Sequence, residues 1–351
     1  MTILSIIISN FNYAHFLPVA IDSVLSQADD EVELIVVDDV SSDHSREIIA
    51  GYGERITPVL HEVNKGHGGA FNSGFAASRG DLVMFLDADD FLLPGAIEAI
   101  RANVEQGVAI YHYRMLIADE TGTLGDLFPP EQQSLASGDI ASKLLKHGRY
   151  DGTITSGLVF SRAALAQVMP MDQEAFRQGG DGYLSAVVPL YGESRSIDRP
   201  LSGYRRHGAN HSSFQSSLLK RTRWYLNHDA ERHREIIRHA RRLGLPVEDT
   251  ISRHDKSHLE SRLVSLLLAP ESHPFAEDTR ARVAGDALKA IPETALLRTK
   301  IGQRLWFVLL GYGPKPMARK LIMWKLEPDS RPTAVAKTGR FLRTRLGLML
   351  R

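Results

Sequence analysis

A short apolar run that ends in a cluster of acids constrains this chain more than any other stretch. Leu82 to Leu86 are apolar and lead into Asp87, Asp89 and Asp90. A run this short, bounded by polar residues, predicts a strand buried on both faces. In open α/β sheets ligands bind beyond the carboxyl ends of the strands, so we expect the acids at a ligand site. A solvated acidic turn that only ends a strand is the alternative that this stretch leaves open.

The Asp-x-Asp spacing indicates which ligand such a site would take. In an extended backbone Asp87 and Asp89 point the same way, so both can bind a hard divalent cation such as Mg2+ or Mn2+. Carboxylates that are buried together repel one another and are costly to desolvate unless a cation or a proton compensates them. The pair therefore predicts a cation site at the end of this strand.

The residues before this run predict an α/β fold with parallel strands. Ile3 to Ile8 and Glu33 to Val37 read as buried strands, and a helix with an apolar stripe from Leu17 to Leu25 lies between them. A strand, a helix and a strand joined in this way form a βαβ unit, which pairs its strands in parallel. The second strand ends in Asp38 and Asp39, so it too brings carboxylates to the edge of the sheet.

A glycine-rich stretch, residues 64–74, follows a predicted third strand at 57–63. It is expected to be a loop that leads into a helix, whose N-terminal amides can bind a phosphate. The stretch matches neither the G-x-G-x-x-G pattern nor the Walker pattern. A dinucleotide-binding fold and a P-loop ATPase are therefore not supported.

The amino-acid composition indicates which binding partners and which cellular compartment are compatible with the chain. Lys plus Arg and Asp plus Glu both number 42, so no overall basic balance indicates nucleic acid. The chain has no cysteine, which excludes disulfides and fits a reducing compartment. The amino-terminal residues lack the pattern of a signal peptide, and no apolar run approaches the ~18 residues of a membrane span. We expect a cytoplasmic protein.

The carboxy-terminal segment differs in charge from the rest. Residues 298–351 contain 13 Lys or Arg and 2 acids, which leaves 29 basic against 40 acidic residues in 1–297. Aromatic residues are interleaved with the positive charges, a composition typical of a segment lying on an anionic membrane. A helical subdomain with a solvated basic face is the alternative. Helical spacing from about residue 216 predicts an all-helical extension, 216–297, before this tail.

Five motifs stand together in an order that is typical of one protein family. They are Ser5–Tyr13, Ala20–Gln27, Val37–Asp43, Asn64–Gly74 and Phe85–Asp90. In this order and spacing they resemble the family 2 glycosyltransferases, and the resemblance covers residues 1 to about 215. It implies a GT-A fold, a single nucleotide-binding α/β domain with a mostly parallel sheet flanked by helices. It also implies transfer of a sugar from a nucleotide diphosphate with inversion. Val40 and Phe71 depart from the family, which usually has Gly and Arg at these positions.

The resemblance also implies roles for individual residues. Asp181 matches the position of the catalytic base, although Gly180 stands where the family usually has Glu, and a helix N-cap is the structural alternative for this aspartate. Asp89 and His207 match the metal-binding positions, and Arg205 and Arg206 match positions near the diphosphate. The residues expected around the nucleotide are Ser9, Asn10, Asn12, Asp38, Asp39, Asn64, Lys65, Asn72 and Asp87.

The function expected from the resemblance is that of an inverting glycosyltransferase with Mn2+ or Mg2+ as cofactor. A UDP-sugar is the default donor, and the acceptor is a hydroxyl of a glycan or a lipid-linked molecule in surface polysaccharide or glycolipid assembly. Segment 298–351 is expected to contact an anionic membrane at its inner face. A non-catalytic nucleotide-sugar binding module and a sugar nucleotidyltransferase of related fold are the alternatives. The expected domains are 1–215, 216–297 and 298–351.

Overall fold

The computed structural model describes residues 2–208, 218–292 and 297–326. The chain divides into two compact units. The first contains residues 1–144, 149–213 and 234–245, and the second contains 145–148, 214–233 and 246–351. The last 25 residues of the predicted basic tail, 327–351, lie outside the described residues.

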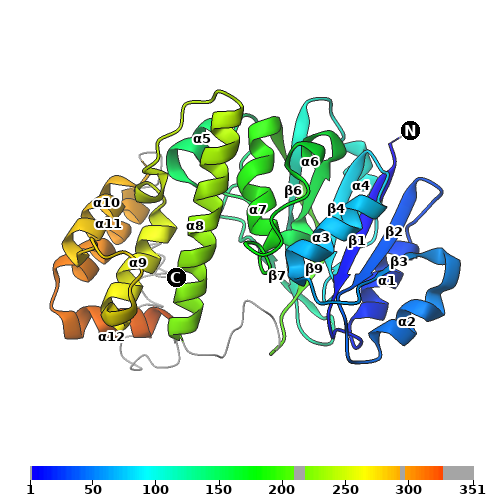
Figure 1. Ribbon diagram of the computed structural model, residues 1–351, viewed down its shortest axis with the longest axis horizontal. Coiled ribbons are helices and arrows are strands. Elements are labelled where there is room, and N and C mark those ends of the chain that lie inside the picture. Colours follow the sequence, from blue (N-terminus) through cyan, green and yellow to red (C-terminus); the bar gives the residue numbers. More distant parts are fainter. Residues whose placement is uncertain (1, 209–217, 293–296, 327–351) are drawn as a thin grey trace. The chain divides into compact units, whose positions relative to one another are not determined.

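The first unit is built on a nine-stranded mixed sheet (Figure 1). One half holds β3 (Thr57–Leu60), β2 (Val32–Asp38), β1 (Leu4–Asn10) and β4 (Leu82–Asp87), all parallel. The order continues through β8 (Leu158–Ser161), β6 (Val108–Ala118), β9 (Glu193–Arg205) and β5 (Phe91–Leu92), and β7 (Leu124–Phe128) pairs with β6. In this second half only β6 and β9 are parallel. The expectation of a mostly parallel sheet therefore holds for the amino-terminal half alone.

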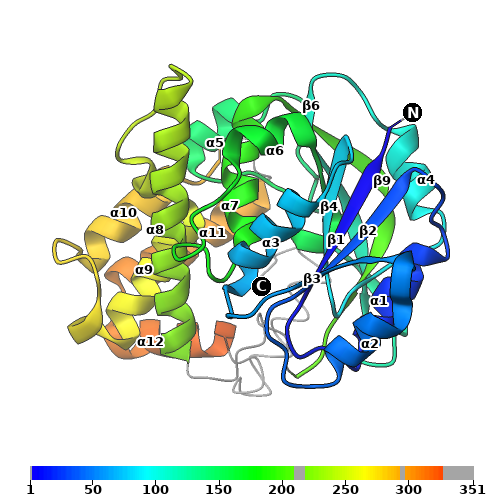
Figure 2. The same ribbon diagram turned by 45° about the vertical axis from the view of Figure 1, so that its right-hand side comes forward.

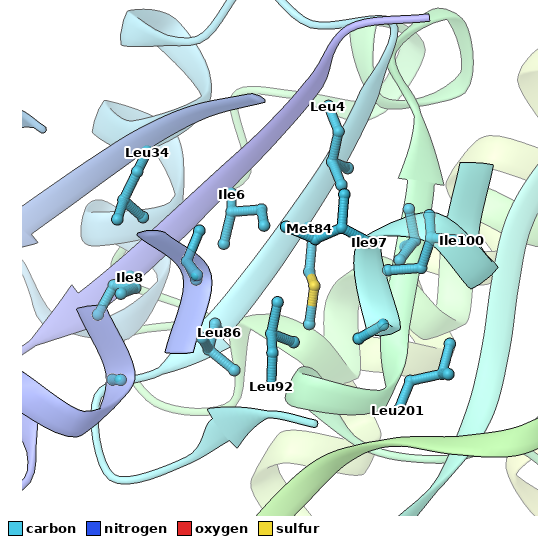
Figure 3. Close-up of a cluster of buried hydrophobic side chains, with 14 of the residues drawn as sticks. Leu4, Ile6, Ile8, Leu34, Met84, Leu86, Leu92, Ile97, Ile100 and Leu201 are labelled. Carbon is cyan, nitrogen blue, oxygen red and sulfur yellow. The ribbon is translucent and has the colours of Figure 1, made fainter. Parts of the chain in front are cut away.

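Helices cover both faces of the parallel half (Figure 2). On one face, α1 (Leu17–Leu25), α2 (Ser45–Tyr52) and α4 (Ala96–Ala102) pack on the even-numbered residues of β1 and β4. Figure 3 shows Ile6 and Ile8 of β1 in the same buried cluster as Met84 and Leu86 of β4. On the other face, α3 (Gly66–Ala77) packs on β1 and β2. Burial on both faces explains why these strands have continuous apolar runs instead of alternating ones.

The strand register brings the predicted polar residues to one edge. In the parallel pairs Asn10 lies opposite Asp38, and Ser9 lies opposite Asp87. The carboxyl ends of β1, β2 and β4 therefore meet at the same edge of the sheet. This is the edge where ligands bind in open α/β folds.

The glycine-rich stretch is a helix and not the loop expected from the sequence. Helix α3 begins at Gly66, and its glycines provide close packing. A Cβ on Gly68 would lie 2.6 Å from the Phe176 carbonyl, and one on Gly74 would lie 2.3 Å from Ile7. The amides at the start of the helix are also used within the protein, because His67 and Gly68 donate to the carbonyls of Arg177 and Phe176. The expected phosphate site at these amides is therefore not supported.

Three strands of the second half, β5, β7 and β9, were not expected from the sequence. Strand β9 is 13 residues long but has a polar sequence, because much of it lies on a partly exposed part of the sheet. Strand β7 pairs with β6 as an antiparallel hairpin, and α5 (Ala141–His147) follows it. The remaining helices of this half, α6 (Arg162–Val168) and α7 (Gly180–Val187), follow β8.

The second unit is helical, as the sequence predicts. Its core joins α9 (Lys256–Leu268), α10 (Arg280–Lys289), α11 (Leu297–Tyr312) and α12 (Lys315–Leu326). The long helix α8 (Leu218–Arg242) begins in this unit and ends in the first. Among the described residues, none of the helices is both long and apolar enough to cross a bilayer.

Val40, where the family usually has Gly, has a left-handed backbone with φ 68°. This conformation costs a residue with a Cβ about 1–2 kcal/mol, and β-branching makes it worse. We expect Val40→Gly to raise the free energy of unfolding by roughly 1 kcal/mol in urea titrations, after the greater chain entropy of glycine in the unfolded state is subtracted. Val63 is an exposed loop valine whose φ is not positive, so it serves as the control. Val63→Gly should lower the stability slightly, and equal effects of the two substitutions would show that Val40 is unstrained.

Candidate functional site

Three carboxylates form an acidic cluster at the end of β4. Asp87, Asp89 and Asp90 place one oxygen each within 4.8 Å of one another. The Nε2 atom of His207 lies 3.0 Å from Oδ2 of Asp89, although the two residues are 118 positions apart. Carboxylate oxygens are the ligands that Mg2+ and Mn2+ prefer, and imidazole also binds transition metals. The donor set therefore fits the expected divalent cation, and the solvated acidic turn does not describe this cluster.

Asp90 was expected at this site, but the sequence interpretation assigned the cation only to the outer residues of the Asp-x-Asp pair. It is buried, and Oδ1 accepts a hydrogen bond of 2.8 Å from the backbone amide of Arg205. Burial, followed by the charges of Asp89 and Asp87, raises the pKa of Asp90 well above its usual range. An excess of negative charge of this kind is what a bound cation compensates.

Arg205 occupies a different place from the one expected. Its side chain is buried, and Nε donates to the backbone carbonyl of Asp89 over 2.8 Å. Its guanidinium also lies over the rings of Phe16 and Phe91, 4.8 Å and 5.2 Å from their centroids. The predicted phosphate contact of Arg205 does not fit this placement, because the side chain orders the acidic cluster from within the protein. The neighbouring Arg206 is exposed.

Aromatic residues surround the imidazole of His207. Its ring centroid lies 4.7 Å from that of Phe16 and 5.8 Å from that of Tyr13. Burial raises the pKa of the Tyr13 hydroxyl, and the charges of Asp89, Asp87 and Asp90 raise it further. The sequence interpretation missed both aromatic residues. The loop after β1 therefore contributes apolar surface beside the acidic cluster, as well as the polar groups predicted for it.

His67 connects the acidic cluster to helix α7. The backbone amide of Gly180 donates to Nδ1 of His67 over 3.3 Å, and Nε2 lies 3.5 Å from Oδ1 of Asp87. Burial alone lowers the pKa of His67, but the carboxylates of Asp87, Asp181 and Asp89 outweigh it and raise this pKa above its ordinary value. Sequence reasoning missed His67 because one histidine in a glycine-rich stretch is a weak signal.

Asp181 lies in the first turn of α7, close enough to the acidic cluster to interact with it electrostatically. Its charge raises the pKa of both His67 and Asp87. The helix begins at Gly180, and the N-cap is Gly179 in a left-handed conformation with φ 75°. The structural alternative, in which Asp181 is the N-cap, is therefore wrong. Its carboxylate is half-buried.

The loops after β1 and β2 are joined by hydrogen bonds. Asn10 donates to Asp38 over 3.0 Å, and Oδ1 of Asn12 accepts from the backbone amide of Ser42 over 2.7 Å. Asp38 has no exposed surface and also accepts from Arg46. Burial alone raises the pKa of Asp38, but hydrogen bonds from Ser41, Arg46 and Asn10 outweigh it and bring this pKa below its ordinary value. Asp38 is therefore held as an anion by partners within the protein.

Asp39 is held at the start of α3. Its carboxylate accepts from the backbone amides of Lys65 and Gly66 over 2.8 Å and 2.7 Å. His61, which the sequence interpretation missed, lies between Asp39 and Ser73, with Nδ1 2.7 Å from the carboxylate and Nε2 2.8 Å from the hydroxyl. A carboxylate can accept about four hydrogen bonds, so one position on Asp39 is left after these three.

Two asparagines expected to contact the nucleotide are used inside the protein. Asn72 donates to the carbonyl of Met171 and accepts from its amide, with 2.9 Å for each bond. Asn64 donates to the carbonyl of Asp39 over 2.8 Å and accepts from the Arg177 guanidinium over 2.7 Å. Their placement does not support a nucleotide contact. Both instead hold the segment that precedes Asp181 against α3.

Comparison with known proteins identifies the class of this site. Residues 5–133 match the family model described as glycosyl transferase family 2. The amino-terminal part of the chain is similar to this glycosyltransferase family. The fold and the acidic cluster described above agree with that assignment, and the metal-binding and nucleotide-binding roles of individual residues remain predictions.

Curated relatives share this family 2 domain. An uncharacterized glycosyltransferase of Nostoc is 37% identical over 214 residues, which cover 59% of this chain and 66% of the relative. A GalNAc(5)-diNAcBac-PP-undecaprenol beta-1,3-glucosyltransferase of Campylobacter jejuni is 32% identical over 166 residues, which cover 46% of this chain and 52% of the relative. The matched segments thus span between about half and two thirds of these relatives.

Solved structures match over a greater length at lower identity. The crystal structure of S. aureus TarS 1–349 in complex with UDP-GlcNAc has a TM-score of 0.58 and 15% identity, and the match covers 99% of this chain and 93% of that one. At this identity the likeness concerns the fold alone. The expected GT-A architecture with a helical carboxy-terminal region is thereby confirmed.

Proposed function

We propose that this protein is an inverting glycosyltransferase that moves a sugar from a nucleotide diphosphate, UDP by default, to an acceptor hydroxyl. The observation that carries the proposal is the cluster of Asp87, Asp89 and Asp90 with His207, which His67 connects to the helix of Asp181. A hard cation site and a separate carboxylate are the two groups that this reaction needs. The match of residues 5–133 to the family 2 model supports the same chemistry.

Asp89 and His207, together with Asp87, are the residues that would hold Mn2+ or Mg2+. A divalent cation held by these residues would supply positive charge to neutralise a departing diphosphate. Asp87 is also proposed to contact the ribose. The exposed Arg206 is the remaining candidate for a contact with the phosphates, since Arg205 is buried.

Asp181 is proposed as the general base. Its carboxylate would take the proton from the acceptor hydroxyl as the oxygen attacks the anomeric carbon, on the face opposite the leaving group. Inverting glycoside hydrolases use a carboxylate in the same way, to activate the attacking oxygen across the ring from the bond that breaks. No acid residue is required, because the diphosphate leaves without a proton.

The nucleotide is proposed to bind at the ends of β1 and β2. Ser9, Asn10 and Asn12 would contact it from the loop after β1, and Lys65 from the start of α3. Asp39 is a better candidate than Asp38 for a hydrogen bond from the base, because it is buried but keeps 3% exposure and one acceptor position, whereas Asp38 has no exposed surface. The UDP-GlcNAc bound by TarS supports a uridine nucleotide.

The acceptor is proposed to be a glycan or a lipid-linked molecule at the inner face of a membrane, in surface polysaccharide or glycolipid assembly. The name of the Campylobacter relative, which acts on an undecaprenol-linked glycan, supports a lipid-linked acceptor. The basic segment 298–351 would contact the anionic membrane. A cytoplasmic location follows from this proposal.

A thermal-shift screen of UDP, GDP and dTDP, with and without Mn2+, tests the donor proposal. A ligand at ~100 times its dissociation constant stabilises the protein by about 2.7 kcal/mol. We expect UDP with Mn2+ to give the largest shift. Equal and negligible shifts for all three nucleotides would contradict the proposal.

The bridge formed by His67 can be separated into two interactions. An asparagine at this position keeps an acceptor near Nδ1 for the Gly180 amide, and a glutamine keeps a donor near Nε2 for Asp87. We expect His67→Asn and His67→Gln each to lower kcat by about 10-fold, because misplacement of Asp181 relative to the donor is costly. The apparent donor affinity should fall only in His67→Asn, which loses the contact with Asp87.

His44→Asn is a matched control, since His44 is an exposed histidine at the start of α2. It should leave both kinetic constants unchanged. If His67→Asn and His67→Gln keep the wild-type kcat at equal stability, His67 has only a packing role.

A further inference from the structure

Helix α11 carries apolar side chains on two sides. Phe307 and Leu310 are buried in the core of the second unit. Five other large side chains are exposed, namely Leu297 (72%), Ile301 (55%), Leu305 (57%), Val308 (41%) and Tyr312 (59%). At ~100° per residue they fall within an arc of about 80°, so they form a single line along the helix. We call this set the α11 stripe.

The α11 stripe is more apolar than the surface of a solvated helix should be. Helices that pack on a core normally have polar residues on the opposite side, and a helix that is apolar all round is usually buried or in contact with a membrane. Contiguous exposed apolar surface marks an interaction site. Because Phe307 and Leu310 already anchor the helix in its core, the stripe is available for a partner.

The charge around the α11 stripe indicates the kind of partner. Residues 297–326 contain seven Lys or Arg and no acid, although Lys325 is paired with Glu260 and Arg319 donates to the carbonyl of Leu267. Arg304 and Lys315 are exposed on or next to this helix, and Lys320 lies 5.2 Å from the ring centroid of Trp324 on α12. An apolar line on one helix, with exposed cations and an aromatic ring on the same helix and the next one, is typical of segments that lie in the interface of an anionic bilayer.

Two other candidate partners of the α11 stripe are less compatible with the positive charge of residues 297–326. A second copy of the chain would bring the same positive surface against itself. The terminal segment 327–351 contains six Lys or Arg and two acids, so it too is positively charged. Like charges placed against each other in an interface are unfavourable. Anionic lipid is the occupant whose charge complements the surface.

We propose that the α11 stripe inserts into the headgroup region of an anionic bilayer and that the surrounding cations bind the lipid phosphates. This inference rests on the membrane contact proposed above and names the residues that would make it. It does not depend on glycosyl transfer. It assigns the apolar contribution to α11, which lies in the described part of the chain, and not to the terminal residues.

Co-sedimentation of the full chain with vesicles tests the inference. Wild-type protein should bind vesicles of phosphatidylglycerol and phosphatidylcholine at low ionic strength, and salt should weaken this binding because it screens the cations. The double substitution Ile301→Glu with Leu305→Glu should reduce the partition coefficient by at least about 10-fold, because two apolar contacts are lost and two negative charges are added. Vesicles of phosphatidylcholine alone should bind wild-type protein weakly.

Leu124→Glu provides the matched control. Leu124 is an exposed leucine on β7 of the first unit, and its substitution should leave vesicle binding unchanged. Both variants should keep the wild-type thermal unfolding curve and the wild-type shift with UDP and Mn2+. If neither the wild-type protein nor the variants show a thermal shift with UDP and Mn2+, but the wild-type protein still binds vesicles, the glycosyltransferase proposal is contradicted. The lipid inference is then unaffected.

Three results would overturn the inference. The first is equal vesicle binding by wild-type protein and the double variant, or no binding by either. The second is a wild-type dimer in solution that the double substitution converts to a monomer, which would make a second copy the occupant. The third is faster tryptic cleavage within 327–351 in the double variant without lipid, which would make the terminal segment the occupant.

Discussion

Asp181→Asn is expected to lower turnover by about 10^2-fold or more while the affinity for the donor stays nearly unchanged. The amide keeps the volume of the side chain but cannot accept the proton of the acceptor hydroxyl. Asp181 is not the N-cap of α7, because Gly179 occupies that position, so the substitution should leave the helix intact. The measurement is kcat with saturating UDP-sugar and acceptor, together with the dissociation constant of UDP.

Asp126→Asn is the control for this prediction, because Asp126 is an exposed aspartate on β7. It should keep the wild-type turnover. If Asp181→Asn retains turnover within a factor of a few, the base must be sought elsewhere, and Asp151, Asp172 and Glu174 are the next candidates. Asp151 is the weakest of these, since it is paired with Lys143 over 2.7 Å.

Asp89→Ala should abolish the contribution of Mn2+ to UDP binding and leave metal-free binding nearly unchanged. The reason is that Asp89 and His207 are assigned to the cation, whereas the base and the ribose are assigned to other residues. Turnover should fall by about 10^2-fold or more, since a metal ion contributes several kcal/mol to stabilisation of the transition state. Calorimetric titration of UDP with and without Mn2+ measures the first effect.

The substitution also removes the partner of the His207 ring, which lies 3.0 Å from Asp89. His207→Ala is therefore measured alongside it and should weaken the effect of Mn2+ in the same direction. Asp126→Ala controls for the loss of one negative charge. Equal loss of UDP binding with and without Mn2+ in Asp89→Ala would give Asp89 a structural role.

The parallel half of the sheet and its acidic edge were predictable because their signals are local. Continuous apolar runs mark strands buried on both faces, and each run ends in polar residues that parallel pairing brings to one edge. The strands expected at 3–8 and 33–37 are β1 (Leu4–Asn10) and β2 (Val32–Asp38), and the helix expected at 17–25 is α1 (Leu17–Leu25). The second half was less predictable, since the polar sequence of β9 gains its strand structure from pairing with β6.

The sequence by itself therefore determined the α/β framework, the acids at the end of β4 and the helical character of the second unit. Only the tertiary structure decided which side chains have partners inside the protein. Asn72 bonds to Met171, 99 positions away, and Arg205 bonds to the carbonyl of Asp89, 116 positions away. His67 likewise reaches Gly180, 113 positions away. Local patterns record burial and periodicity, whereas these bonds join segments that meet only after folding, so no pattern in the neighbouring residues indicates them.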